Sequence, residues 1–200
     1  MRTTVSPLRL GAALICVAGL LGLAACSSDS AGTGETATSV PRSAAVTVPP
    51  GQQERTVPGT TLDFGASAVL PADAYRAEGA TAMYTVTGIT PGKDVPSAQT
   101  RGGTAYFVYV TVTSLAARPA PAPGVLGFAG SVDGRSAALT MPPSTSLADC
   151  ANPKPPETMR RGESYATCLV AYADEGQKLR QVIYWADTTG DDALNYKASP

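Results

Sequence analysis

The chain has 200 residues, of which 15 are basic, 16 are acidic and none is histidine, so its formal net charge is −1. This balance gives no basic surface for binding nucleic acid, and the commonest general base and metal ligand is missing. Apolar residues make up 44% of the sequence, enough for one core, while 20 glycines and 17 prolines favour turns over long helices.

Residues 1–25 are predicted to be an export signal. Arg2 and Arg9 form a positive head, and the apolar run from Leu10 to Leu23 is too short for a permanent membrane helix. The run ends in a four-residue motif, Leu23, Ala24, Ala25 and Cys26. This motif resembles the lipobox of bacterial lipoproteins, which implies cleavage before Cys26 and a lipid anchor on its thiol, at the extracytoplasmic face of the cell membrane. The alternative is an ordinary signal peptide followed by an unrelated cysteine.

Residues 26–59 are expected to be the lipidated cysteine and a flexible tether. The stretch is dominated by Ser, Thr, Gly, Pro and Ala and has no aromatic residue, so it buries too little apolar surface to offset its ordering entropy. A coil of this length spans roughly 30 Å. Loss of Arg2 and Arg9 with the signal leaves 13 of the 15 basic residues against 16 acidic ones, a net charge of −3. Anchoring is therefore expected to depend on the lipid and not on attraction to anionic membranes.

Residues 60–200 are expected to be one all-β domain, because short β-rich runs alternate with turn residues. The expected strands are Met83–Thr87, Tyr106–Thr113, Val125–Val132, Ala137–Met141, Tyr165–Tyr172 and Gln181–Trp185. Asp133-Gly134 predicts a hairpin, and Glu175-Gly176 predicts a similar turn before the last strand. The stretch Asp73–Glu78 is long enough to form one turn of helix. The spacing favours an antiparallel β-sandwich, with a closed barrel as the alternative.

The strongest predicted strand, Tyr106–Thr113, has two different faces. One face carries Tyr106 and three valines, and the other carries Phe107, Tyr109 and two threonines. We expect the valine face in the core and the threonine-bearing face nearer to water. Trp185 is expected in the core or on the sheet surface, with a binding patch as the alternative.

Cys150 and Cys168 are the two cysteines that remain once Cys26 is acylated and Cys16 leaves with the signal. In an exported protein such a pair is expected to form a disulfide, and closing this loop would stabilise the fold by about 3 kcal/mol. A redox-active pair is the alternative, but the close spacing of a Cys-x-x-Cys motif is absent.

A family resemblance rests on the order of these features. A hydrophobic strand follows Gly102-Gly103, the Asp133-Gly134 turn comes next, Arg161-Gly162-Glu163 leads into Tyr165–Tyr172, and Val182-Ile183-Tyr184 closes the series. This order resembles the immunoglobulin-like domain of actinobacterial lipoproteins and is similar in outline to the mycobacterial secreted immunogenic β-sandwich antigens. The resemblance implies an immunoglobulin-like sandwich and transfers no activity.

Chemical motifs are weak throughout the sequence. Serine catalysis lacks a base, since no lysine follows a serine by three positions, and Gly162-Glu163-Ser164 only begins like a nucleophile elbow. Asp174-Glu175 and Asp191-Asp192 are adjacent acids of the kind usually found solvated. The run 187–192 has oxygen ligands but lacks the rhythm of a calcium loop. We therefore expect no enzyme, no metal and no cofactor.

Two functions remain in view. The first is a lipid-anchored, non-catalytic protein-interaction module at the cell envelope, with Tyr75, Phe107 or Tyr109 as exposed anchors. The second is a carrier of a lipid or other apolar ligand, for which the small residues of Val125–Gly130 would open a cavity between the sheets. A cavity would favour the carrier, and a contiguous exposed apolar patch would favour the module.

Overall fold

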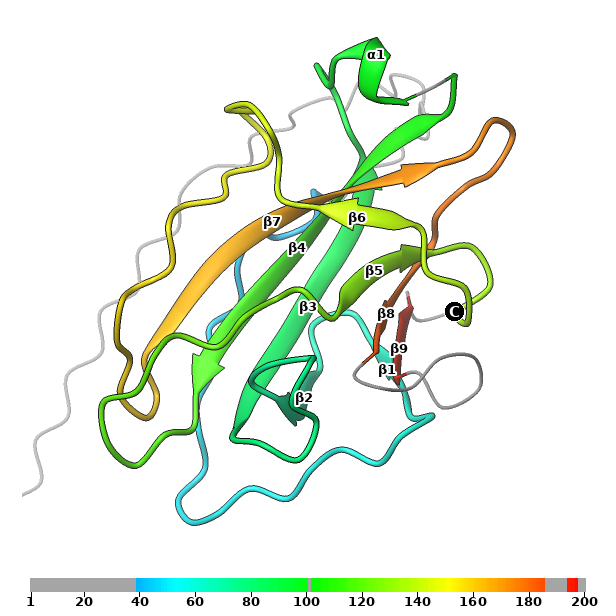
Figure 1. Cartoon of the computed structure of the whole chain (residues 1–200). Helices are drawn as coiled ribbons and strands as arrows, with labels where there is room; N and C mark the ends of the chain where they lie inside the picture. Colours follow the sequence, from blue (N-terminus) through cyan, green and yellow to red (C-terminus); the bar gives the residue numbers. More distant parts are fainter. Residues whose placement is uncertain (1–38, 101, 186–193, 198–200) are drawn as a thin grey trace, which may run out of the picture. The chain divides into compact units, whose positions relative to one another are not determined.

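A computed structural model describes residues 39–100, 102–185 and 194–197. Within this part, nine strands form two facing sheets (Figure 1). The five-stranded sheet has the order β2-β3-β4-β7-β6, from β2 (Ser67–Pro71), β3 (Thr81–Pro91), β4 (Thr104–Ser114), β7 (Ser164–Ala173) and β6 (Leu139–Met141). The four-stranded sheet has the order β1-β9-β8-β5, from β1 (Thr61–Asp63), β9 (Leu194–Lys197), β8 (Gln181–Tyr184) and β5 (Phe128–Ser131).

All strand pairs are antiparallel except β1 with β9, and a short helix, α1 (Ser97–Thr100), separates β3 from β4. Each sheet is open, with two edge strands. The predicted β-sandwich is therefore confirmed, and the closed barrel is wrong.

The core lies between the sheets. The valine face of β4 is fully buried there, as predicted, together with Tyr84 of β3 and Leu169 of β7. The four-stranded sheet contributes aromatic side chains. The ring of Phe128 lies 5.2 Å from that of Tyr84 and 4.9 Å from that of Tyr184. This aromatic packing between the sheets fills the interior, because large rings bury much apolar area per residue.

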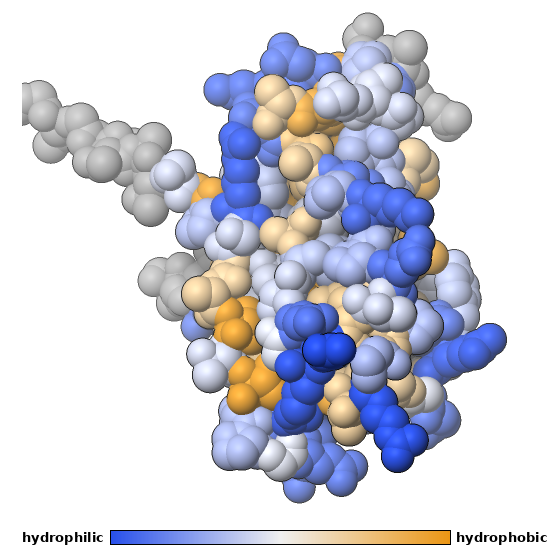
Figure 2. Space-filling view, turned by 90° about the vertical axis from the view of Figure 1, so that its left-hand side faces the viewer, coloured by the Kyte–Doolittle hydropathy of each residue, from blue (hydrophilic) through white to orange (hydrophobic). Residues whose placement is uncertain are grey.

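The outer face of the five-stranded sheet is also buried, which corrects one expectation. Phe107 is 1% exposed and Tyr109 is 5% exposed, and both pack in a second cluster with Cys150, Cys168 and Val170. Two irregular segments cover this face, the strap described next and the loop 142–158. Figure 2 shows the domain from the left-hand side of Figure 1, where hydrophobic side chains lie in separate groups among hydrophilic ones.

Residues 39–58, which we call the strap, lie against the domain although they were expected in the tether. The side chain of Val40 packs on the second cluster and lies so close to Gly88 that a Cβ there would be 2.5 Å from Val40 Cγ1. The amide of Ala44 donates to Thr111 Oγ1 at 2.9 Å, and Arg161 donates to the carbonyl oxygen of Pro49 at 2.9 Å. Specific contacts to the sheet thus order a segment of low hydrophobicity, and the folded domain begins near residue 39 instead of residue 60.

The turn predictions were right about position and wrong about connection. Asp133-Gly134 forms a tight turn in which Gly134 has a φ of +79°, but it links β5 to β6, which belong to different sheets. The turn at Glu175-Gly176 likewise passes from β7 to β8 in the other sheet. Asp73–Glu78 forms turns without a helix. The amide of Arg76 donates to the carbonyl oxygen of Asp73, three residues earlier, which is the hydrogen bond of a tight turn.

Candidate functional site

Three segments far apart in the sequence meet at one end of the sandwich. They are the loop 72–80 between β2 and β3, the loop 120–127 before β5, and Trp185 after β8. The amide of Gly124 donates to the carbonyl oxygen of Ala72, and the amide of Trp185 donates to that of Gly127, both at 2.9 Å. These backbone hydrogen bonds hold the three segments in one arrangement.

Buried tyrosines attach the same loops to the core. The hydroxyl of Tyr84 shares its proton between the carbonyl oxygens of Gly124 and Pro71, at 2.9 and 3.2 Å. The hydroxyl of Tyr184 also donates to Pro71, at 2.9 Å. Because these carbonyl groups lie in or beside the two loops, the side chains of β3 and β8 fix the positions of both loops.

Tyr165 adds a further attachment, since its hydroxyl donates to the carbonyl oxygen of Pro123 at 2.6 Å. Burial raises the pKa of Tyr165 to about 12. Burial, with a smaller effect of Tyr184, also raises the pKa of Tyr84 far above its ordinary value. Both hydroxyls therefore stay protonated at neutral pH and keep donating to the loops.

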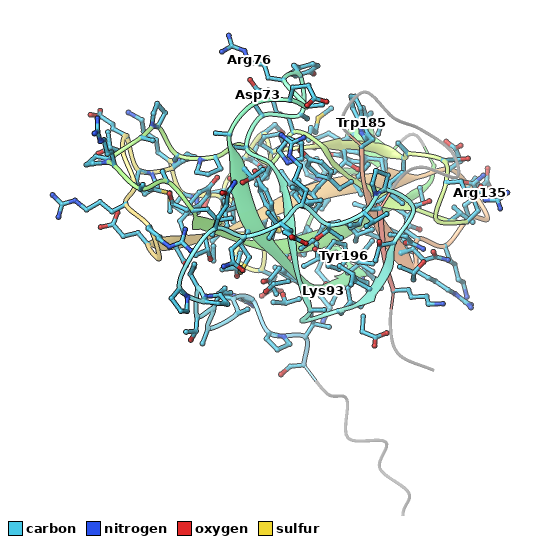
Figure 3. The ribbon with its side chains drawn as sticks, turned by 90° about the horizontal axis from the view of Figure 1, so that it is seen from below. Asp73, Arg76, Lys93, Arg135, Trp185 and Tyr196 are labelled. Atoms are coloured by element: carbon cyan, nitrogen blue, oxygen red, sulfur yellow. A yellow bond between two sulfur atoms is a disulfide. The ribbon has the colours of Figure 1, made fainter. Side chains whose placement is uncertain are left out.

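Each of these segments carries one large apolar or aromatic side chain at the surface, beside exposed charged residues such as Asp73 and Arg76 of the loop 72–80, and we call Tyr75, Leu126 and Trp185 the apolar end. Tyr75 is 68% exposed, Leu126 is 60% exposed and Trp185 is half-buried. The rings of Tyr75 and Trp185 meet edge to face with centroids 6.4 Å apart. Figure 3 shows Trp185 on the same side of the domain as Asp73 and Arg76, which belong to the loop that carries Tyr75.

Two surface hollows adjoin the apolar end, and Leu126 lines both. One, of about 640 Å³, is lined by Trp185, Leu139 of β6 and Ile183 of β8, with Arg135 also in its wall. The other, of about 630 Å³, lies between the loops 72–80 and 120–127. The two hollows adjoin at Leu126, and both are lined largely by apolar surface, of the kind that mediates contacts between proteins.

Of the three predicted anchors, the structure exposes Tyr75 and buries Phe107 and Tyr109. The two buried residues were wrong as anchors because the strap and the loop 142–158 cover their face of the sheet. Trp185 lies in the wall of a hollow, not in the core. Leu126 was not predicted as a site residue because it stood inside a predicted strand, but it lies in the loop before β5.

The glycine-rich run that suggested a carrier is closely packed at its glycines, and its residues Leu126, Phe128 and Ala129 line the surface hollow of about 640 Å³ described above. A Cβ at Gly130 would lie 2.7 Å from the side chain of Leu179, and one at Gly127 would lie 2.4 Å from the ring of Tyr184. The hollow that reaches the core residues Leu70, Tyr184 and Leu194 has a volume of about 230 Å³. This is below the ~300–1,000 Å³ typical of ligand pockets.

The residues considered for catalysis or metal binding are placed as follows. Ser164 shares a hydrogen bond with Thr113 at 2.7 Å, and Glu163 accepts the amide of Arg160 at 2.7 Å, so both stabilise a turn and strand. Asp174 and Glu175 are exposed in the turn after β7. Residues 187–192 lie outside the described part. Within that part, no group of three or more His, Cys, Asp or Glu residues is placed to hold a metal.

Cys150 and Cys168 form the expected disulfide, which ties the loop 142–158 to β7 beneath the strap. The predicted signal and lipobox, including Leu23, Ala24, Ala25 and Cys26, lie outside the described residues. Within the described ranges, no helix has the length and hydropathy to cross a membrane.

No protein-family model matches the chain, and no curated protein matches its sequence. The fold is similar to the crystal structure of MPT63, a secreted protein from Mycobacterium tuberculosis, with a TM-score of 0.51 and 13% sequence identity. The similarity covers 68% of this chain and 95% of MPT63. At this identity the likeness concerns the fold alone, and it agrees with the resemblance to mycobacterial secreted β-sandwich antigens that the sequence indicated. The chain therefore shares the β-sandwich architecture of a secreted mycobacterial protein.

Proposed function

We propose that the protein is a lipid-anchored, extracytoplasmic module, non-catalytic, that binds another protein of the cell envelope through its apolar end. The observation that carries this proposal is the exposure of Tyr75 and Leu126 on loops that buried tyrosines hold in place. Rigid presentation favours binding, because little conformational entropy is lost when a partner docks. Aromatic residues are also the commonest energetic anchors of protein interfaces.

The anchor of this proposal is a lipid on Cys26, supported by the lipobox-like motif at residues 23–26. Because the strap begins at residue 39, only residues 27–38 separate Cys26 from the domain. A flexible chain of that length spans roughly 20 Å, less than the whole stretch to residue 59 would span. The domain would thus stay close to the membrane.

The attachment point and the apolar end lie apart along β3. The strap starts beside Gly88, whereas the loop 72–80 joins β3 at Thr81. Seven strand residues correspond to about 23 Å. An anchor that joins the domain at residue 39 therefore leaves the apolar end free to meet a partner.

Site-specific crosslinking in intact cells tests the interaction. A photo-crosslinking residue at position 126 is expected to capture a discrete envelope protein, whereas the same residue at Lys154, exposed on the loop 142–158, serves as the control. Capture at 126 that disappears in a Trp185→Ala background supports the proposal. Equal capture at both positions, or none at 126, would overturn it.

Membrane attachment is tested separately with Cys26→Ser. Loss of the thiol that accepts the lipid is expected to release the protein from the membrane fraction. If the variant stays in that fraction to the same extent as the wild type, the anchoring proposal is wrong.

A further inference from the structure

The polar groups at the apolar end are mainly hydrogen-bond donors. Among the described residues, neither the hydroxyl of Tyr75 nor the indole N–H of Trp185 has a hydrogen-bond partner. An indole nitrogen can only donate, and a tyrosine hydroxyl can donate as well.

Several acceptors of the same region are already engaged. Asp73 accepts the amide of Tyr75 at 2.9 Å and lies 3.7 Å from Arg76 Nε. The carbonyl oxygens of Pro71, Pro123 and Gly124 accept the tyrosine hydroxyls.

Arg135 and Ser136 line the hollow that contains Trp185, and the carboxylate of Asp133 accepts the backbone amides of both residues at 2.8 Å. These bonds lower the pKa of Asp133 below its ordinary range, so its carboxylate stays charged and engaged at neutral pH. The apolar end thus offers the hydroxyl of Tyr75 and the indole N–H of Trp185 as donors beside apolar area, while several acceptors nearby are used. An occupant complementary to it supplies hydrogen-bond acceptors and apolar side chains.

A proline-rich chain has this complementary character. Proline lacks a backbone N–H, and in the polyproline II conformation the carbonyl groups make no internal hydrogen bonds and point outward as acceptors. In a helix or a sheet, most backbone carbonyl groups already accept hydrogen bonds within the element, so few of them are available to the donors of the apolar end. We propose that the apolar end binds a proline-rich segment of the partner in the polyproline II conformation; this inference rests on the proposed interaction function.

The shape of the surface fits the same occupant. A polyproline II helix has three residues per turn and a rise of about 3.1 Å per residue, so it presents a ridge of prolines along one side. Tyr75 and Trp185 pack edge to face, and Leu126 lies between the two hollows. Such a ridge can pack against these aromatic side chains and enter the hollows. Peptide-recognition domains that bind proline-rich segments use aromatic-lined grooves.

Trp185 is the single tryptophan of the chain, so its fluorescence reports directly on this site. The full exported chain is titrated with a proline decapeptide and, as the control ligand, with a glycine-serine decapeptide of equal length. A saturable change of Trp185 emission with the proline peptide alone is expected. The response should depend weakly on salt, because uncharged groups dominate the contact.

Variants locate the binding. Tyr75→Ala is expected to weaken proline-peptide binding by about tenfold or more, as for an interface anchor. Tyr75→Phe, which keeps the ring and loses the donor, should weaken it less. Tyr172→Phe is the matched control, since Tyr172 lies away from the apolar end and bonds to Gln99, and it should bind as the wild type does.

A flat titration with the proline peptide, an equal response to both peptides, or unchanged binding by Tyr75→Ala would overturn this inference. If position 126 still captures an envelope protein in cells while the proline peptide gives no signal, the interaction function stands and the chemistry of the partner is wrong. If both experiments fail, the interaction function fails with it.

Discussion

Two groups of aromatic side chains in this domain differ in their exposure to solvent. Phe107 and Tyr109 on the outer face of the five-stranded sheet are buried beneath the strap and the loop 142–158. Tyr75 at the apolar end stays 68% exposed, although its loop is fixed by buried tyrosines. Segments of the chain itself thus cover the aromatic side chains of the outer sheet face, whereas Tyr75 at the apolar end stays exposed. We therefore expect the covered face to contribute to stability and the open end to be available for binding.

The largest expected effect is at the covered face. Phe107→Ala removes a fully buried ring and leaves a cavity between the sheet and the segments that cover it, so it should lower the free energy of unfolding by about 3–5 kcal/mol. Denaturant unfolding followed by circular dichroism measures this change. A loss below about 1 kcal/mol, the range of weakly packed positions, would show that the strap and loop cover the face only loosely.

The disulfide beneath the strap should rank next. Replacing both cysteines, Cys150→Ser with Cys168→Ser, frees the loop 142–158 and should lower stability by about 3 kcal/mol in the chain-entropy view. The readouts are denaturant unfolding and the rate of proteolytic cleavage within the loop. Reduction of the wild-type protein is the control and should give a loss of similar size; an unchanged cleavage rate would contradict the assigned role of the disulfide.

Alkaline pH tests the tyrosines that hold the apolar end. Their ordinary pKa is 10, and burial raises it to about 12 for Tyr165 and further for Tyr84. Below pH 10 these groups are protonated in both states, and their stabilising effect is fully present. Above pH 10 the unfolded chain releases protons that the fold retains, so stability falls. The part due to Tyr165 is lost by about pH 12.

Unfolding curves at pH 8, 10 and 11 measure this loss. A Tyr84→Phe variant has one ionisable hydroxyl fewer and should lose less stability between pH 10 and 11 than the wild type. An equal loss in both proteins would place the titrating groups elsewhere.

At neutral pH the same variant tests the attachment of the loops. Tyr84→Phe removes the hydrogen bonds to Gly124 and Pro71, so it should cost about 1 kcal/mol of stability and weaken binding at the apolar end. Tyr106→Phe is the matched control, because Tyr106 is equally part of the core and its hydroxyl has no partner among the described residues. Equal effects of the two substitutions would show that the hydroxyl of Tyr84 does not position the loops.

The sequence predicted the parts of the fold that carry strong local patterns. The alternation in β4 identified both the strand and its core face, and β3 and β7 were located by their β-branched and aromatic residues. β1 and β9 were missed because they are short and contain Asp63, Asn195 and Lys197, residue types that are uncommon in strands, and β2 was missed because it ends in a proline. Turn chemistry located the Asp133-Gly134 turn but carries no information on which sheet receives the next strand.

The site was harder to predict because exposure depends on which segments cover which face. The strap is rich in small and polar residues, so composition suggested a tether. Its half-buried Val40, Ala44, Val46 and Val48 nevertheless recur at even spacings, the period of an extended segment with one inward face. That alternation was a usable signal. Because the alternation was not used, the sheet face that carries Phe107 was expected to be exposed. The structure shows that this face is covered, whereas the loop that carries Tyr75 is exposed.

The smallest expected effect on stability belongs to the open end. Tyr75→Ala should change the free energy of unfolding by no more than about 0.5 kcal/mol, because an exposed side chain outside the core contributes little. The same substitution should abolish most of the crosslinking from position 126. This separation of stability from binding is the reverse of that expected for Phe107→Ala, where binding is lost only as far as the fold is lost. If Tyr75→Ala instead unfolds the domain readily and leaves crosslinking intact, the ring supports the loop 72–80, and the apolar end is not where a partner binds.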